Sequence, residues 1–100
     1  MSLLIAGTVR VPPQSLHGLR PHMLAMMAAS RAEDGCLTYS YAVDVADAGL
    51  IRVFEAWRDG AAIEAHFKAP HMADWRAAWP QFGVSDRRLS LYEVASERPL

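Results

Sequence analysis

Two histidines lie five positions apart in the stretch EAHFKAPHMADW, residues 64–75. A neutral imidazole can remove a proton or bind a metal ion near neutral pH, so this pair is the first candidate for chemistry. On one continuous helix, His66 and His71 would lie about 140° apart around the axis, whereas joint ligation of one ion needs an i, i+4 spacing. Pro70 interrupts the segment in any case. We therefore consider each histidine separately and expect no metal site.

His66 is predicted to point toward the protein interior. It shares a helix face with Ala62 and Ile63 and is followed by Phe67. Two interpretations remain open: a buried imidazole held by one hydrogen bond, or a base inside an enclosed pocket. His71 would stand one position into the next helix, as a partly exposed residue of its first turn.

Glu55 lies in the middle of the apolar stretch VFEAW. It alternates onto the same strand face as Val53 and Trp57, where a carboxylate needs a partner or a raised pKa. The structural interpretation is an ion pair with Arg52, with Arg58 or with an arginine on a neighbouring strand. The functional interpretation is a carboxylate that orients or polarises an imidazole across a site.

Large flat and flexible side chains accompany these polar residues. Met72, Trp75 and Trp79 repeat at the i, i+3, i+7 spacing of a core-facing helix, so packing in the core is the simplest explanation. Together with Trp57 and Phe82, they would also suit the wall of a pocket for a planar aromatic ligand. The two roles are compatible.

Composition argues against several other functions. The chain has 10 basic and 11 acidic residues and a formal charge of -1, so we expect no nucleic-acid partner. Cys36 is the single cysteine, which excludes an internal disulfide and a zinc knuckle, and no base adjoins it in sequence. No glycine-rich loop leads from a strand into a helix, so a phosphate or dinucleotide site is not expected. The amino terminus has neither a signal pattern nor a membrane-span pattern, and we expect a cytoplasmic protein without a membrane partner.

Four strands are expected to carry and frame these residues. The segments 3–11, 36–45, 50–58 and 87–96 are rich in β-branched, aromatic and aliphatic residues, with clear period-two alternation in the second. Residues 46–49, ADAG, predict a hairpin turn between the second and third strands. The middle two strands should therefore pair antiparallel.

Two helical units are expected between the strands. Apolar residues at three-four spacing predict a helix over 15–31, with Pro21 expected to kink it or to mark its start. Gly35 suits a left-handed exit from that unit. Asp59 is predicted to cap the second unit, and Pro70 to divide it into two helices.

The resulting order, β-α-β-β-α-β, is the ferredoxin-like plan, an α+β fold with a four-stranded antiparallel sheet and helices on one face. We expect one domain over residues 1–100. Three Trp, three Tyr, three Phe and five Met are more large apolar side chains than so small a domain easily hides from water. A second copy of the chain is the economical cover for the other sheet face.

Two stretches, SRAEDGCLTYSYAVD and FEAWRDGAAIEAHFKAPHMADW, resemble the antibiotic biosynthesis monooxygenase family of small dimeric ferredoxin-like proteins, which includes quinol and anthrone oxygenases. The resemblance covers roughly residues 3–95. Its most specific parts are Glu33 with GCLTY, Glu55, Trp57, Ala65-His66 and Pro70-His71.

The resemblance implies a homodimer of the dimeric α/β-barrel type, with a cavity in each subunit between sheet and helices. It also implies chemistry without flavin, metal or haem, in which a deprotonated quinol-type or anthrone-type aromatic substrate reacts directly with molecular oxygen. A base and a fixed hydrogen-bonding group are the minimum equipment for that reaction. On this interpretation His66 is the catalytic base or proton relay and Glu55 orients it. The expected substrate-binding residues are Trp57, Tyr39, His71, Met72, Trp75, Trp79 and Met27.

Two alternatives remain open. One is a non-enzymatic dimer that binds or senses an aromatic or lipid-like molecule in the same pocket. The other is haem binding or degradation, for which the related branch places a ligating histidine near the position of Trp75 and an asparagine on the first strand. This sequence has no asparagine. Gly18 and Pro21 also depart from the family's usual first helix, which leaves the shape of the pocket rim open.

Overall fold

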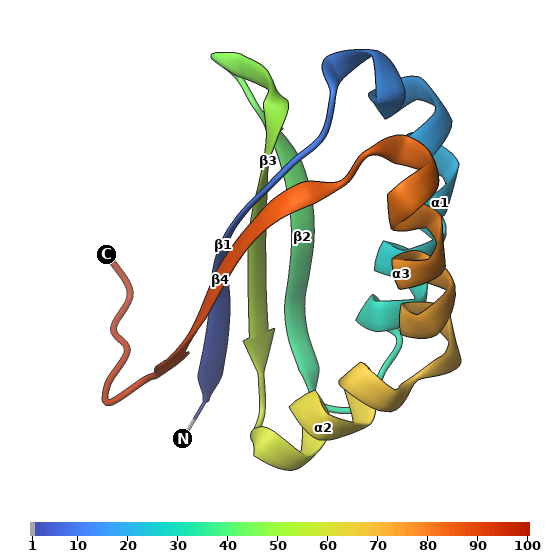
Figure 1. The fold of residues 1–100 in the computed structure, drawn as a ribbon. Coiled ribbons are helices and arrows are strands. Elements are labelled where there is room, and N and C mark those ends of the chain that lie inside the picture. Colours follow the sequence, from blue (N-terminus) through green and yellow to red (C-terminus); the bar gives the residue numbers. More distant parts are fainter. Residues whose placement is uncertain (1) are drawn as a thin grey trace.

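The computed structural model describes residues 2–100 and shows a sheet covered on one face by helices (Figure 1). The strands lie in the order β2-β3-β1-β4, and every neighbouring pair is antiparallel, which confirms the ferredoxin-like plan. Among the described residues, no helix combines the length and the hydropathy that crossing a membrane would require. The elements are β1 (Leu3–Arg10), the 3-10 helix η1 (Pro13–Ser15), α1 (Leu16–Arg31), β2 (Cys36–Asp44), β3 (Asp47–Trp57), α2 (Gly60–Lys68), α3 (Pro70–Phe82) and β4 (Ser85–Glu93).

The β2–β3 hairpin is tighter than predicted. The sequence favoured a turn over 46–49, but β3 already begins at Asp47, which pairs with Asp44. The Asp44 carboxylate accepts a hydrogen bond from the Ala46 amide at 2.9 Å, so a side chain stabilises the short turn. At the other end of the sheet, β4 ends at Glu93, three residues before the predicted range closes.

Helix α1 passes through Pro21 without ending there. It begins at Leu16, so Pro21 lies in the second turn and removes only the hydrogen bond to the carbonyl of His17, whose side chain is exposed. Gly18 permits the close approach of the two long helices, because a Cβ there would lie 2.7 Å from Cε1 of Phe82. Gly18 therefore allows α1 to pack against the end of α3.

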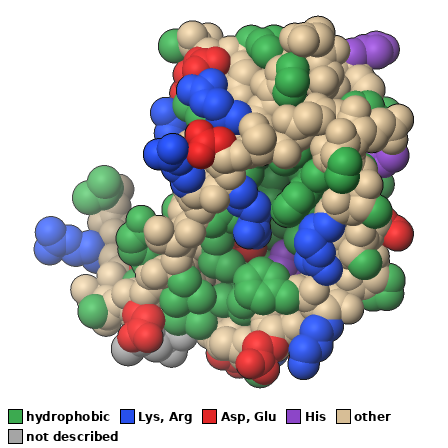
Figure 2. Space-filling view, in the orientation of Figure 1, with side chains coloured by type: hydrophobic (Ala, Val, Ile, Leu, Met, Phe, Trp, Pro, Cys, Tyr) green, Lys and Arg blue, Asp and Glu red, His purple; other side chains and the backbone are tan. Residues whose placement is uncertain are grey.

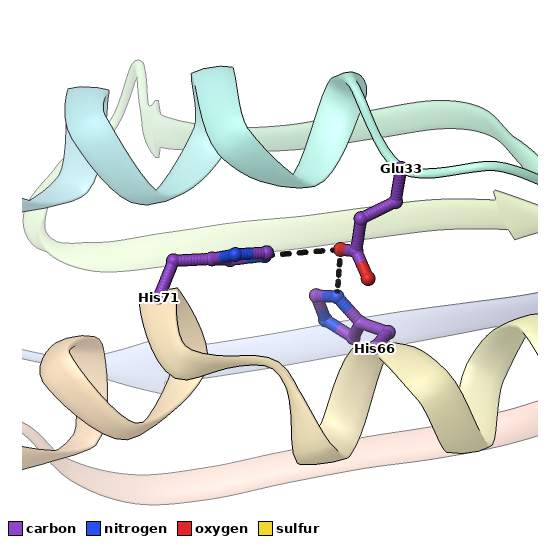
Figure 3. A group of neighbouring side chains, drawn as sticks. All are labelled: Glu33, His66 and His71. Atoms are coloured by element: carbon purple, nitrogen blue, oxygen red, sulfur yellow. Dashed lines mark hydrogen bonds and ion pairs between the residues drawn. The ribbon is translucent and has the colours of Figure 1, made fainter.

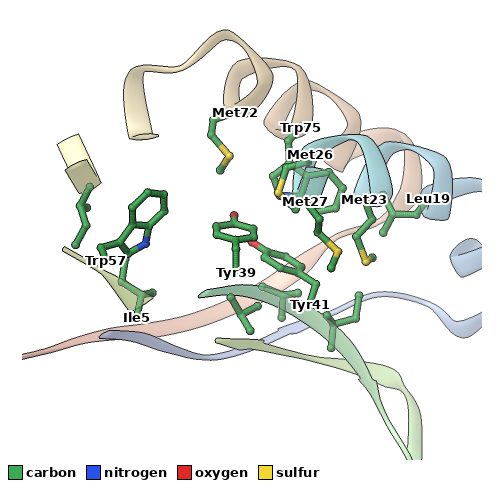
Figure 4. Close-up of a cluster of buried hydrophobic side chains, with 14 of the residues drawn as sticks. Ile5, Leu19, Met23, Met26, Met27, Tyr39, Tyr41, Trp57, Met72 and Trp75 are labelled. Carbon is green, nitrogen blue, oxygen red and sulfur yellow. The ribbon is translucent and has the colours of Figure 1, made fainter. Parts of the chain in front are cut away.

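The apolar core fills the space between the sheet and helices α1 and α3 (Figure 4). Tyr39 and Tyr41 of β2 stack at 5.7 Å between ring centroids, and Trp75 of α3 meets Tyr41 edge-on at 5.8 Å. The alternation predicted for β2 gives one face with Leu37, Tyr39, Tyr41 and Val43. This face is buried only in its middle, since Leu37 is 58% and Val43 45% exposed. The register of β2 shifts near both ends of the strand, and β2 forms an edge of the sheet.

Candidate functional site

The break between α2 and α3 builds the site. Helix α2 is capped by Asp59, whose Oδ1 accepts from the Ala62 amide at 2.9 Å, as predicted. Ala69 is extended, with φ −66° and ψ 142°, and Pro70 is the first residue of α3, also as predicted. Because the chain changes direction between these helices, residues near the end of one and the start of the other can reach a common neighbour.

That neighbour is Glu33, in the loop between α1 and β2. Its Oε2 accepts hydrogen bonds from Nδ1 of His66 at 2.6 Å and from Nε2 of His71 at 3.1 Å (Figure 3). The two histidines, which the sequence led us to consider separately, therefore share one hydrogen-bond acceptor. Glu33 was visible in the sequence only through the family resemblance, because its partners are 33 and 38 residues away.

The Glu33 contact sets the state of His66. A carboxylate can only accept, so Nδ1 carries the proton and Nε2 of the neutral ring carries a free lone pair. His66 is 1% exposed, and its Nε2 has no hydrogen-bond partner among residues 2–100. Burial lowers the pKa of His66, and the hydrogen bond and charge of Glu33 oppose that shift. The side chain thus presents an unpartnered basic nitrogen inside the protein.

Glu55 lies on the other side of this imidazole. The carboxylate is 3% exposed, its Oε1 is 4.0 Å from Nε2 of His66, and it accepts a hydrogen bond from Trp57 Nε1 at 2.9 Å. Burial raises the pKa of Glu55, and the bond from Trp57 opposes that shift. The orienting contact expected of Glu55 is made by Glu33 instead. Glu55 faces the free nitrogen without a hydrogen bond to it.

The ion pair considered for Glu55 does not form with either neighbouring arginine. Arg52 Nε binds Asp44 Oδ1 at 2.8 Å, and Arg58 forms a two-pronged pair with Asp34 at 3.1 and 3.2 Å. Both pairs are on the surface, where an ion pair contributes little stability. The buried carboxylate therefore depends on the indole of its own strand.

Replacing Glu55 with glutamine should raise thermal stability by several degrees at neutral pH, and the gain should grow with pH. The folded pKa of Glu55 lies above the unfolded value of 4.5, so the stability associated with its protonated form is complete below pH 4.5 and is lost as pH rises through the folded pKa. Glutamine still accepts from Trp57 and never ionises. Calorimetric melting temperatures of both proteins from about pH 4 to about pH 8 check this. A difference that does not vary with pH would contradict it.

Two predicted pocket residues surround the imidazole but belong to the core. The rings of Trp57 and Tyr39 lie 4.6 and 5.2 Å from the ring of His66, measured between centroids, and both side chains are buried. The hydroxyl of Tyr39 has no hydrogen-bond partner in the part of the chain that the structure describes, and burial raises the pKa of Tyr39. These rings exclude water from one side of the site.

The other predicted pocket residues divide among three cavities. Met72 and Trp79 line a cavity of about 270 Å³ with Phe67, Arg76 and Arg87. In Figure 2 a hollow between β4 and the helices has hydrophobic side chains on its walls and basic side chains beside it, with acidic and histidine atoms at its floor.

The remaining predicted residues line different spaces. His71 and Trp75 border a cavity of about 240 Å³ between α1 and α3, and Met27 borders one of about 420 Å³ between α1 and β2. The seven residues expected to bind substrate thus do not share one wall. The 270 Å³ cavity adjoins His66 through Phe67, whose ring centroid is 5.8 Å from that of the imidazole.

Glu33, His66 and His71 also form a group whose ligand atoms all lie within 4.8 Å of one another. Two histidines and a carboxylate are a donor set that divalent transition metals accept. The contacts of 2.6 and 3.1 Å have the lengths of hydrogen bonds, and two imidazole N–H groups that donate to one carboxylate explain them. We therefore treat the group as a hydrogen-bonded network.

Solved structures share this fold across almost the whole chain. A protein from Deinococcus radiodurans, with a proposed assignment as an antibiotic biosynthesis monooxygenase, superposes with a TM-score of 0.88 at 24% identity and covers 100% of this chain and 98% of its own. PA3566 from Pseudomonas aeruginosa superposes with a TM-score of 0.79 at 32% identity, over 94% of each chain.

Sequence comparison agrees. The uncharacterized protein sll1783 from Synechocystis is 26% identical over 98 residues, which are 98% of this chain and 67% of that protein. Rv0793 from Mycobacterium tuberculosis, whose name proposes a monooxygenase activity, is 37% identical over 65 residues, 65% of this chain and 63% of its own length. The family model described as antibiotic biosynthesis monooxygenase matches residues 2–78. The chain therefore belongs to the antibiotic biosynthesis monooxygenase family.

Proposed function

We propose that this protein is a cofactor-independent monooxygenase that oxidises a compact, electron-rich aromatic of the quinol or anthrone type with molecular oxygen. The observation that carries the proposal is His66, a buried imidazole that donates through Nδ1 to Glu33 and has no partner at Nε2 among residues 2–100. Its neighbour Phe67 lines a cavity with aromatic walls. Membership of the family supports the reaction class.

For an anthrone, the reaction balances without an external reductant. Nε2 of His66 takes a proton from the ring carbon, and the electron pair of the broken C–H bond is delocalised into the ring system. The anion passes one electron to O2, and the two radicals combine to form a C–O bond. The resulting peroxide anion takes up a proton and becomes a hydroperoxide. The hydroperoxide then loses the second C–H proton and hydroxide, so one oxygen atom remains as a carbonyl and the other leaves as water.

The surroundings of His66 favour the first step. A dry site strengthens electrostatic interactions, and the hydrogen bond to Glu33 stabilises the imidazolium that forms when Nε2 takes the proton. Burial raises the pKa of Glu55, which disfavours a second full negative charge where the substrate anion develops. Glu33 is thus a positioning residue, and His66 is the catalytic one.

The test is turnover of anthrone, a hydroxylated anthrone and a reduced naphthoquinone by purified protein, with and without oxygen. We expect product only with oxygen, and one labelled atom in the new carbonyl when isotopically labelled O2 is supplied. No oxygen-dependent product from any of them would contradict the proposal. If the same compounds raise the melting temperature without turnover, a binding or sensing protein becomes the better explanation.

We also propose that the protein forms a homodimer through the outer face of the sheet. Phe54 and Tyr92 are about half exposed there, opposite Ala6 and Leu4 respectively in the strand register. An exposed apolar surface of this kind is typical of an interface. Light scattering of the purified protein should give twice the chain mass, and a monomer at micromolar concentration would contradict this.

A further inference from the structure

The cavity beside His66 is bordered by two arginines, Arg76 and Arg87. Arg76 projects from α3, and Arg87 from β4 on the face of that strand that also carries Leu89. Arg76 donates to the carbonyl of Phe67 at 3.3 Å, and the guanidinium of Arg87 lies 5.6 Å from the centre of the Trp79 ring. Neither one forms an ion pair within residues 2–100.

Four of the other arginines are paired with aspartates, whereas Arg20, Arg31 and Arg98 form no ion pair within residues 2–100. Arg10, Arg52, Arg58 and Arg88 each hold an aspartate at 2.8 to 3.1 Å. The chain as a whole carries a formal charge of -1, so it does not lack carboxylates. Two unpaired guanidinium groups beside one small cavity therefore attract an anion from solution.

The side chains that line the cavity indicate which chemical group accompanies the anionic group of the ligand. Phe67, Met72 and Trp79 are flat or flexible apolar side chains, and the indole N–H of Trp79 is buried without an acceptor. The stacked Arg87 is held in place by the ring beneath it, so little freedom is lost when its planar group binds a carboxylate. About 270 Å³ is slightly smaller than the sites of drug-sized ligands, which favours two or three fused rings.

We propose that the cavity binds an aromatic carboxylate, with Arg76 and Arg87 holding the carboxylate at the mouth and Trp79, Phe67 and Met72 packing against the rings. This places the opposite end of the ring system toward His66. The inference deepens the proposed function and rests on it for the direction of the ligand. It names the substrate class as an acidic hydroxyaryl compound.

The charges of Arg76 and Arg87 also influence the pKa values of His66 and Glu55. After burial and Glu33, the charge of Arg76 is among the influences on the pKa of His66, which it lowers. After burial and the Trp57 bond, the charge of Arg87 lowers the pKa of Glu55. Both arginines therefore lie within electrostatic reach of the site, and an anion bound between them would be near it too.

The experiment compares a hydroxynaphthoate with the naphthol that lacks its carboxylate, by titration calorimetry without oxygen. The wild-type protein should bind the carboxylate at least about 10-fold more tightly, the worth of one good charge-assisted hydrogen bond. Arg76→Gln and Arg87→Gln should each reduce this preference, and the double variant should abolish it while naphthol binding stays nearly constant. Added salt should weaken only the carboxylate.

Arg88→Gln is the matched control. Arg88 is the neighbour of Arg87 in sequence, is paired with Asp86 and alternates onto the outer face of the sheet, so its replacement should leave the preference unchanged. Equal affinities in the wild-type protein, or a preference that survives the double variant, would overturn the inference. So would a preference abolished by Arg20→Gln, because Arg20 lines the separate 420 Å³ cavity.

Failure of this inference can be told apart from failure of the proposed function. If the carboxylate binds in an arginine-dependent way but no oxygen-dependent turnover occurs, the binding site is supported and the proposed reaction is contradicted. Oxygen-dependent turnover of neutral anthrones, together with equal wild-type affinities for the hydroxynaphthoate and the naphthol, would support the reaction and rule out the carboxylate site.

Discussion

Replacing His66 with glutamine should lower kcat/KM for an oxidisable aromatic by about 100-fold to 10,000-fold, the usual contribution of a general base. Glutamine can still donate an N–H to Glu33 and fill much of the same space, but it offers no basic lone pair. Initial rates of oxygen uptake, with circular dichroism to verify folding, measure the effect. An unchanged rate in a folded variant would mean that the buried imidazole serves packing alone.

His71→Gln is the matched control, since His71 donates to the same carboxylate oxygen. It borders a different cavity and is partly exposed, so we expect a loss of no more than about threefold, within the range of a modest rearrangement. Equal, large losses in both variants would show that the network acts as a unit and that neither imidazole is uniquely the base.

The pH dependence of the rate tests the role of Glu33 in the same assay. The carboxylate raises the pKa of His66 against the effect of burial, so Glu33→Gln should lower that pKa further. A base acts in its neutral form, and activity is lost as pH falls through its pKa. The acidic limb of the rate profile should therefore move to lower pH, and the plateau should fall because the base is weaker. If Glu33 served the structure alone, Glu33→Gln would lower the rate but leave the acidic limb of the profile at the same pH.

Local chemistry made much of the fold predictable. Asp59, Ala69-Pro70 and Gly35 each act within a few residues of their own position: a cap, a break and a left-handed turn with φ +84°. Such features depend on side-chain and backbone preferences that the sequence contains directly. The burial of His66 followed from helix periodicity in the same way.

Contacts between distant segments were not predictable in this way. Glu33 contacts His66, which is 33 residues away in sequence. Because Glu33 lies in a loop, no periodicity of the sequence predicts which helix its side chain faces. The division of the predicted pocket residues among separate cavities depends on how α1 packs beside α3, which no single helix encodes. Arg87 was missed because its role depends on which face of an edge strand it occupies, and the sheet register fixes that.

The second large effect concerns the strand that carries Arg87. Replacing Gly7 with alanine should destabilise the protein by roughly 2–5 kcal/mol, from backbone strain together with overpacking. Gly7 has φ +156°, and a Cβ there would lie 1.9 Å from the carbonyl oxygen of Arg88 and 2.9 Å from Cα of Leu89. Backbone atoms cannot rotate away as a side chain can, so β1 and β4 would have to separate. Urea unfolding measures the change in free energy.

Gly60→Ala makes the same chemical change where nothing lies within 4 Å of the added carbon, at the first residue of α2. Alanine reduces the freedom of the unfolded chain, so this variant should be more stable by about 0.4–1 kcal/mol. If Gly7→Ala destabilises the protein and Gly60→Ala stabilises it, the loss of stability comes from the contact between β1 and β4. If Gly7→Ala were as stable as the wild-type protein, β4 would be free to shift. The position of Arg87 at the cavity would then not be fixed by the sheet, and the carboxylate preference would have to come from Arg76 alone.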